Sequence, residues 1–300
     1  MKTQALRGLL AAIMATTATG AFAADLYEPP VVDMPPAEVV VKEVSYGGWY
    51  IRGDLDYHKT KFKDAKYWTY FHDDNGTPDF DADDRVIAEK NGKLEGEIDE
   101  AFSAGLGIGY QVSKHLRTDV TLDHFFEADF EGSTDGFCYD EDLDDFVACS
   151  SEDRTSMSAW LLLANAYVEL GTYGKFTPYV GAGVGGAHIK WDKLVNTIPG
   201  GEFEHKGEKE WRFAWALMAG TSYCLTKNLN LDVGYRFSKV EGGKMFGYDS
   251  VSSSGPGEDD GFHVHEARAG LRYQFGAGNA ACGEPELVAY EPEPLPPVYK

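Results

Sequence analysis

Five histidines and two serines are the side chains best suited to chemistry in this chain. Nucleophilic catalysis needs a serine, a histidine base and an orienting carboxylate within hydrogen-bond reach of one another. The histidines fall near one end of their segments and the serines near the other, so no trio is predicted to converge. The residues are His58, His124, His188, His263, His265, Ser103 and Ser222. We therefore assign no catalytic residue and expect a protein that is not an enzyme.

Two segments carry groups that could bind metal ions. His263 and His265 lie two residues apart, and such residues share one face of a strand, but a transition-metal site needs a third ligand that the sequence does not place. The run 73–84 is rich in carboxylates, yet it lacks the glycine and terminal glutamate of a helix-loop-helix calcium site. No dedicated metal site and no cofactor are predicted.

The segments that must position these side chains are short runs of alternating polar and apolar residues. In the run 266–275, small apolar and aromatic side chains share one face, and the other face carries Glu266, Arg268 and Arg272. A period of two is typical of a strand with one apolar and one polar face. Eight such runs are present: 49–57, 102–112, 116–126, 159–170, 180–185, 211–223, 229–238 and 266–275.

The beginning of the chain and its charge limit where the protein can act. Lys2 and Arg7 flank a short apolar segment that ends at Ala21-Phe-Ala23, which is the pattern of a secretory signal peptide. No later segment approaches the ~18 consecutive apolar residues of a spanning helix, so only a closed barrel could cross a membrane. The formal net charge of −22 argues against nucleic acid as a partner, because phosphates require a basic surface.

The connections between the runs alternate in length. Tight turns at 113–115, 171–175 and 226–228 alternate with long polar connections that hold most of the 49 acidic residues. This asymmetry predicts an all-β fold, an eight-stranded antiparallel up-and-down transmembrane barrel with three short periplasmic turns and four long, acidic outer loops. Both termini are then expected in the periplasm. The predicted loops are 60–100, 127–155, 191–210 and 240–261.

The polar faces of the runs would line the interior of this barrel. An eight-stranded barrel is only wide enough for side chains or one small ligand, so opposite charges inside it should meet and pair. The expected ion-pair network consists of Arg52, Asp54, Asp56, Arg117, Asp119, Asp123, Glu169, Arg212, Asp232, Arg236, Glu266, Arg268 and Arg272. A packed, paired lumen predicts negligible steady conductance.

Four cysteines in an exported chain are candidates for disulfide bonds. Cys138 and Cys149 lie close together in one acidic loop, and Cys224 and Cys282 form the other candidate pair. Connectivity does not follow from the sequence alone.

Several segments resemble a known family, the small eight-stranded outer-membrane barrels of alphaproteobacteria, described as porin-like or opacity-type proteins. The resemblance covers 48–275 without the loops and rests on Gly48-Trp-Tyr-Ile-Arg-Gly53, Ala164-Asn-Ala-Tyr167, 176–185 and 269–275, together with Glu28-Pro-Pro30 in the arm. The closing strand is similar to the signal that the outer-membrane assembly machinery reads, with Arg268, Gly270, Tyr273 and Phe275 at the signal positions.

The chain departs from this family because Phe275 is not its last residue. We expect a signal peptide at 1–23, a proline-rich periplasmic arm at 24–47, the barrel at 48–275 and a proline- and glutamate-rich periplasmic tail at 276–300. Cys282 lies seven residues beyond the closing strand, within ~23 Å of extended reach, so a bond to Cys224 beside a periplasmic turn would tether the tail.

These features favour a non-enzymatic protein of the bacterial outer membrane that stabilises the envelope and presents acidic loops for surface interaction. Its expected partners are outer-membrane lipid, lipopolysaccharide, the assembly machinery and divalent cations shared with lipopolysaccharide phosphates. The alternatives are a narrow porin-like channel, a lipid A-modifying barrel enzyme and a soluble lipocalin-like binder.

Overall fold

The computed structural model of the protein describes residues 39–41, 47–73, 85–140, 145–199, 201–249, 254–276, 282 and 287–289. The predicted signal peptide, most of the proline-rich arm and tail, and nearly all of the acidic run 73–84 lie outside the described residues. Within the described ranges, no helix is long and apolar enough to cross a membrane.

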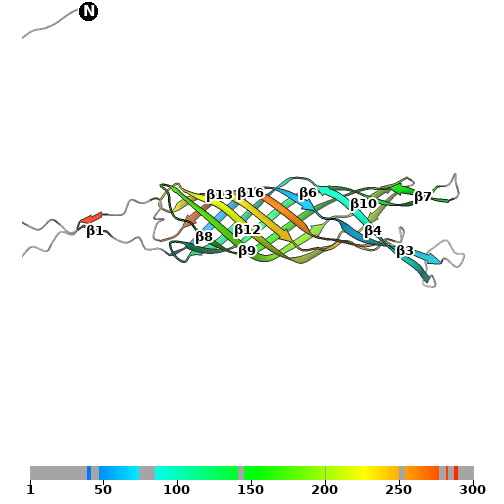
Figure 1. The fold of residues 1–300 in the computed structure, drawn as a ribbon, viewed down its shortest axis with the longest axis horizontal. Helices are drawn as coiled ribbons and strands as arrows, with labels where there is room; N and C mark the ends of the chain where they lie inside the picture. The colour runs from blue at the N-terminus through cyan, green and yellow to red at the C-terminus, as the bar shows by residue number, and fades with distance from the viewer. Residues whose placement is uncertain are drawn as a thin grey trace, which may run out of the picture. The chain divides into compact units, whose positions relative to one another are not determined.

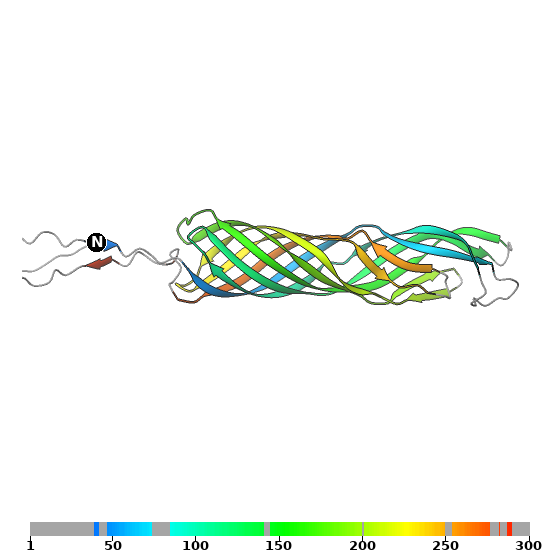
Figure 2. The same cartoon turned by 90° about the horizontal axis from the view of Figure 1, so that it is seen from below.

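Eight antiparallel strands form a closed ring, as the alternating runs predicted (Figures 1 and 2). Each strand pairs with its neighbours along the chain, β16 pairs with β2, and pairing of Leu116 with Val168 through Gly132 with Asp153 joins β6 to β8. The ring therefore has no free edge. Its strands are β2 (Gly48–Phe62), β5 (Ala101–Gln111), β6 (Leu116–Asp140), β8 (Glu152–Glu169), β9 (Phe176–Trp191), β12 (Lys209–Cys224), β13 (Leu229–Val240) and β16 (Phe262–Gln274).

The two faces of the ring differ as the alternation requires. Apolar side chains cover the outside, where Leu55 is 69% exposed and Leu106 is 73% exposed, whereas Asp54 and Arg236 on the inward face are buried. Apolar groups outside and charged groups inside are the reverse of a soluble barrel and suit a wall between lipid and a polar interior.

Three tight turns lie at one end of the ring, which we call the turn end. They connect β5 to β6, β8 to β9 and β12 to β13, and each is closed by backbone hydrogen bonds such as Val112 N to Leu116 O at 2.9 Å and Leu225 N to Leu229 O at 3.0 Å. The long connections leave the opposite end, which we call the hairpin end.

The long connections are mostly β-strand, which the sequence analysis did not predict. They extend β6 and β8 far beyond the ~9–11 residues that a tilted strand needs to cross a bilayer. They also add β3 (Ala65–Asp73), β4 (Arg85–Ile98), β7 (Asp145–Ser150), β10 (Leu194–Ile198), β11 (Gly201–His205), β14 (Gly243–Phe246) and β15 (Ser254–Asp259).

These added strands close a second ring, the hairpin ring. Backbone pairing runs from β6 through β4, β3, β15 and β14, and on the other side from β6 through β8 and β10 to β11. The segment that follows β11 completes the circle, because Glu208 N donates to Met245 O at 3.1 Å and Gly247 N donates to Lys206 O at 2.8 Å. β3, β7 and β10 are seen at this end in Figure 1.

The hairpin ring encloses an apolar core. Where this ring meets the eight-stranded ring, four aromatic rings from β2, β6, β9 and β16 lie with centroids 4.9 to 6.2 Å apart, a separation typical of favourable aromatic pairs. The four are Phe62, Phe130, Trp191 and Phe262. Buried around them are Leu94, Leu194, Met245 and Phe246.

A separate two-stranded sheet pairs the two ends of the chain. β1 (Val39–Val41) pairs with β17 (Leu287–Ala289). The eight-stranded ring and the hairpin ring both lie within one compact unit, residues 41–287.

Candidate functional site

The interior of the eight-stranded ring holds a dense layer of buried charge around Arg236. Its guanidinium donates to Glu266 Oε1 at 2.6 Å and to Asp123 Oδ2 at 2.9 Å, and it lies 3.7 Å from Asp56 Oδ2. All four side chains are completely buried. β6, β13, β16 and β2 each supply one of them, so the contacts fix four strands at one level of the barrel.

Two further arginines extend this layer toward the turn end. Arg268 donates to Asp56 at 3.1 Å and to Asp123 at 3.2 Å, and it lies 3.3 Å from Asp54. Arg52 makes a two-point contact with Asp54 at 2.7 and 2.8 Å and also reaches Asp119 at 3.2 Å. Asp54, Asp56 and Asp123 each contact two arginines, which compensates part of the cost of burying these carboxylates.

The turn-end layer is built around Arg117, which is also completely buried. Its guanidinium carbon lies 3.9 Å from the ring centroid of Tyr167 and 4.7 Å from that of Tyr179, and its Nε lies 3.2 Å from Glu169 Oε1. A cation held between two aromatic faces is stabilised by their quadrupoles where hydrogen-bond partners are few. Arg117 Nη1 lies 3.9 Å from Asp119.

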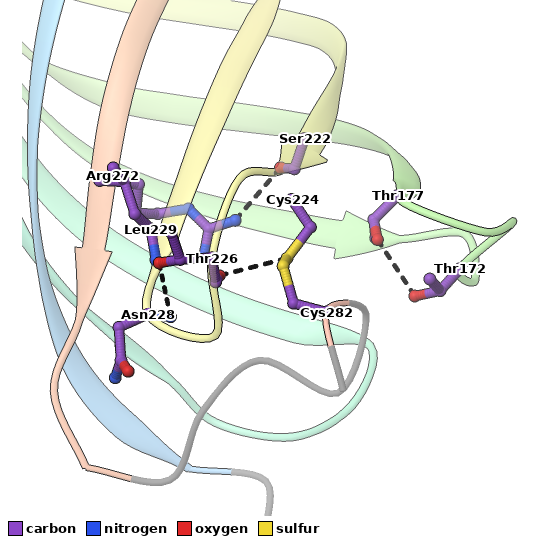
Figure 3. The surroundings of a disulfide bond; sticks show 9 residues. All are labelled: Thr172, Thr177, Ser222, Cys224, Thr226, Asn228, Leu229, Arg272 and Cys282. Atoms are coloured by element: carbon purple, nitrogen blue, oxygen red, sulfur yellow. Dashed lines mark hydrogen bonds between the residues drawn. A yellow bond between two sulfur atoms is a disulfide. The ribbon is translucent and has the colours of Figure 1, made fainter. Parts of the chain in front are cut away.

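Arg272 completes this layer beside the turn between β12 and β13. It forms an ion pair with Asp232 at 3.0 Å and donates to Ser222 Oγ at 3.1 Å, a contact drawn in Figure 3. The structure therefore brings the predicted lumen residues together, with one exception. Arg212 lies inside the hairpin end, where it pairs with groups that the sequence analysis did not include.

Arg212 forms a separate buried ion pair. Its guanidinium donates to Asp259 at 2.7 Å, to Glu210 at 3.3 Å and to the carbonyl of Lys244 at 2.6 Å. Sequence analysis placed Arg212 in the main network because alternation gives only the face of a strand. It gives no height along the barrel axis, and β15, which carries Asp259, was not predicted. Burial raises the pKa of Asp259 to about 6, although Arg212 opposes this shift.

A second polar cluster in the hairpin ring was also missed. The Asp153 carboxylate is buried and accepts hydrogen bonds from Ser151 Oγ at 2.9 Å and from the Asn196 amide. His205 is buried against Phe246, and its Nε2 lies 3.5 Å from Ser254 Oγ. Burial raises the pKa of Asp153 and lowers that of His205. Asp153 and His205 both lie in polar segments, so no sequence signal marked either residue as buried.

The histidines and serines considered for catalysis are spread over the barrel. His58 is buried against Phe125, and Ser222 binds Arg272. Ser103 is buried in the interior. The other histidines face outward against aromatic rings: His124 stacks on Trp160 at 4.4 Å, His188 lies beside Trp211, and His263 and His265 contact Phe237. Within the described ranges, no three histidine, cysteine or carboxylate side chains are placed to share a metal ion.

A disulfide joins Cys224 to Cys282, with their Cα atoms 5.6 Å apart (Figure 3). Cys224 ends β12 and is buried, and its Sγ lies 3.3 Å from the carbonyl oxygen of Thr226 in the following turn. The bond fixes residue 282 to the turn end, as the predicted tether requires. Cys149 is also disulfide-bonded, and the side chain of Cys138 lies outside the described residues.

The residues of the closing strand fall on both faces of β16. Arg268 belongs to the interior network, Gly270 lies against Asp54, and Tyr273 and Phe275 face outward, 44% and 47% exposed. The faces, turns and closing strand of the barrel together define its class. Residues 9–275 match the family model described as the outer membrane protein beta-barrel domain. The chain belongs to this family.

The chain is also similar to several bacterial proteins and to a solved structure. An uncharacterized protein of Brucella abortus (strain 2308) is 37% identical over 295 residues, which cover 90% of this chain and 99% of that protein. The outer membrane protein PagN of Salmonella typhimurium is 30% identical over 148 residues, 48% of this chain and 59% of PagN. Neisserial surface protein A is 17% identical with a TM-score of 0.41, over 76% of this chain and 97% of that structure. The protein is thus a bacterial outer-membrane β-barrel.

Proposed function

We propose that this barrel is a closed, non-enzymatic structural protein of the outer membrane that acts through its acidic hairpin end. In this proposal the turn end and both termini face the periplasm, and the hairpin end projects from the cell. The protein stabilises the envelope and presents a surface for interaction. The observation that carries the proposal is an interior filled at two successive levels.

The lower level is the ion-pair network. Arg236, Arg268 and Arg52 reach across the interior to carboxylates on other strands, so their side chains occupy the space that a pore would need. An eight-stranded barrel has room for little else. Moving an ion through this level would require separating buried, paired charges, which costs several kcal/mol per ion.

The upper level is the aromatic layer of Phe62, Phe130, Trp191 and Phe262, where the eight-stranded ring meets the hairpin ring. Beside this layer lies a small cavity with mostly apolar walls, lined in part by Phe125, Leu161 and Val264. An apolar constriction resists water and ions because it offers them no polar partner. The two levels together favour a closed barrel over a porin-like channel.

The acidic hairpin end supports a role at the cell surface. The long connections at the hairpin end contain most of the 49 acidic residues of the chain. Such a surface can share divalent cations with the phosphates of lipopolysaccharide, which would link the protein to its surroundings. The acidic run 73–84 lies mostly outside the described residues.

Planar-bilayer recording on refolded protein tests the closed barrel. We expect no long-lived openings of nanosiemens size at either polarity, and such openings would establish the channel alternative.

Lipid A from cells with and without the protein should have the same mass, whereas a mass change that follows expression would reveal an enzyme.

Envelope function is tested by deleting the gene and complementing it. We expect the deletion strain to become more sensitive to detergent and to EDTA, and the wild-type gene to restore resistance. Membrane fractionation with heat-modifiable gel mobility locates the folded protein, and protease added to intact cells should cut the hairpin end only. Equal resistance of both strains would contradict the envelope role.

A further inference from the structure

A group of basic side chains lies on the outer wall where β2, β13 and β16 approach the hairpin end. We call Lys61, Lys63, Lys239, His263 and His265 the basic patch. Backbone register places Lys61 directly opposite His263 on β16, and His263 directly opposite Lys239 on β13. Their chain neighbours Thr60, Val264 and Val240 are buried, so the patch residues face outward.

Like charges are concentrated here without full compensation. In the backbone register Lys61 and Lys239 flank His263 on its two sides, and His265 lies two residues further along β16. Glu241 accepts from Lys239 at 2.8 Å, and just below the patch Glu100 accepts from Lys59 at 3.0 Å. Within the described residues, Lys61 and Lys63 form no ion pair. Like charges close together on adjacent strands are destabilising, so an anion bound near Lys61 and Lys239 would reduce their mutual repulsion.

The depth of the patch along the barrel is defined by aromatic residues on the same strands. Phe237 lies 5.6 Å from the ring of His263 and 5.3 Å from that of His265, and the Tyr235 hydroxyl is 2.6 Å from His265 Nδ1. Aromatic belts on membrane barrels mark the boundary between hydrocarbon and headgroups. The basic patch begins at this boundary and continues toward the hairpin end, which is headgroup depth.

We infer that the basic patch binds the phosphate groups of an anionic lipid in the outer leaflet. Lysine ammonium groups bind phosphate as point charges, and Phe237, Tyr235 and Tyr57 below them offer an apolar surface for the acyl chains. An acidic soluble protein is a less suitable partner, because the acidic hairpin end of this chain, which has a net charge of −22, would repel it. The inference rests on the proposed function only for the leaflet that the patch faces.

Lipid titration followed by native mass spectrometry tests the site. Folded protein in zwitterionic detergent is titrated with diphosphoryl lipid A, and in parallel with phosphatidylcholine as a lipid without net charge. The test variant is Lys61→Gln/Lys63→Gln. The matched control is Lys66→Gln/Lys193→Gln, which removes the same formal charge from two exposed lysines that are already paired with Asp260 and Glu204. Heat-modifiable mobility verifies that both variants are folded.

We expect the test variant to lose roughly 30-fold in affinity for diphosphoryl lipid A, because each lysine near a lipid surface contributes about a fivefold factor. The control should bind as the wild type does, and phosphatidylcholine should bind weakly to all three. If the test variant does not fold, Lys61→Gln alone should lose about fivefold.

Three results would overturn the inference. These are equal losses in the test and control variants, binding of phosphatidylcholine as tight as that of lipid A, and displacement of lipid A by millimolar inorganic phosphate, which would indicate a free-anion site. Membrane fractionation, not this titration, tests the proposed function, so the two can fail separately.

Discussion

Individual charged residues hold the barrel interior together through contacts that no pair of neighbours in the sequence reveals. Arg236 on β13 reaches carboxylates from β2, β6 and β16, and all of these groups are completely buried. Burying one charge without a partner is very costly, so the residues of this layer depend on one another. Their identity is therefore constrained more strictly than that of an exposed ion pair.

Replacing Arg236 with alanine should destabilise the barrel by about 3–5 kcal/mol, because Glu266 and Asp123 would remain buried without their main partner. Arg154→Ala is the matched control, since Arg154 and Glu152 are 69% and 75% exposed and such pairs contribute under about 1 kcal/mol. Urea unfolding in lipid vesicles, followed by the heat-modifiable gel shift, measures both. Equal unfolding midpoints for the two variants would show that the network is not stabilising.

Asp259 should make the hairpin ring less stable as pH rises from about 4 to 6. Its pKa in the folded protein is about 6, above the usual value of 3.8, so the folded state binds more protons than the unfolded state in this window. Stability therefore falls with increasing pH until Asp259 is ionised in both states. The lowered pKa of His205 acts in the opposite direction, so a single-site variant is needed to isolate Asp259.

The measurement is hydrogen exchange of β14 and β15 amides at pH 4.5 and pH 7, corrected for intrinsic rates. We expect the change in protection between the two pH values to differ between the wild type and Asp259→Asn, with the wild type losing more protection at pH 7. The same pH response in both proteins would assign the effect to other groups.

At the scale of the strand, glycine decides how closely large inward side chains can pack. Gly109 on β5 faces inward, and a Cβ at this position would collide with the ring of Tyr50 and the backbone carbonyl of Thr118. Gly53 on β2 faces outward, where a Cβ would lie 3.6 Å from Leu106 in ordinary contact. The same residue type therefore has a packing role in one strand and none in the other.

Gly109→Ala should cost about 1–3 kcal/mol, because the tyrosine and the neighbouring strand must both shift to admit a methyl group. Gly53→Ala provides the control and should be neutral or slightly stabilising, since alanine has less backbone freedom to lose than glycine. The two variants are compared by the urea concentration at which half of the folded band is lost in the heat-modifiable gel shift. A Gly109→Ala barrel as stable as Gly53→Ala would show that the interior has more space than the structure indicates.

At the scale of the whole molecule, two stacked rings and one disulfide connect distant parts of the chain. β6 and β8 run through both rings, so the hairpin ring is continuous with the eight-stranded ring. At the other end, the Cys224–Cys282 bond closes a loop of 58 residues that contains β13 and β16. The disulfide thus limits how far the last two strands can separate from the ring when the barrel opens.

Reducing this bond should lower the free energy of unfolding by about 4 kcal/mol, the chain-entropy value for a loop of this length. Cys282→Ser removes this bond alone, because it leaves Cys138 and Cys149 unaltered. Non-reducing peptide mapping verifies that Cys149 is still disulfide-bonded in the variant. The urea midpoint should fall in Cys282→Ser and should not fall further when Cys224→Ser is added. An unchanged midpoint would show that residue 282 contributes nothing to the stability of the barrel.

The sequence by itself determined the class of fold, because a period of two with one apolar and one charged face is a local property of each strand. The run 229–238 and the turn 226–228 carry this information in adjacent residues, and the alternation of short and long connections supplied the topology. The same local signals identified which residues point inward, including Arg236, Asp123 and Glu266 on three different strands.

Only the tertiary structure decided which inward charges meet, since height along a tilted barrel depends on the register between strands that are far apart in sequence. Arg212 and Arg236 share the inward faces of neighbouring strands, yet one pairs with Asp259 at the hairpin end and the other with Glu266 in the membrane wall. The hairpin ring and the basic patch also depend on non-local register. Pairing of β3 with β15 and alignment of Lys61, His263 and Lys239 join segments nearly 200 residues apart.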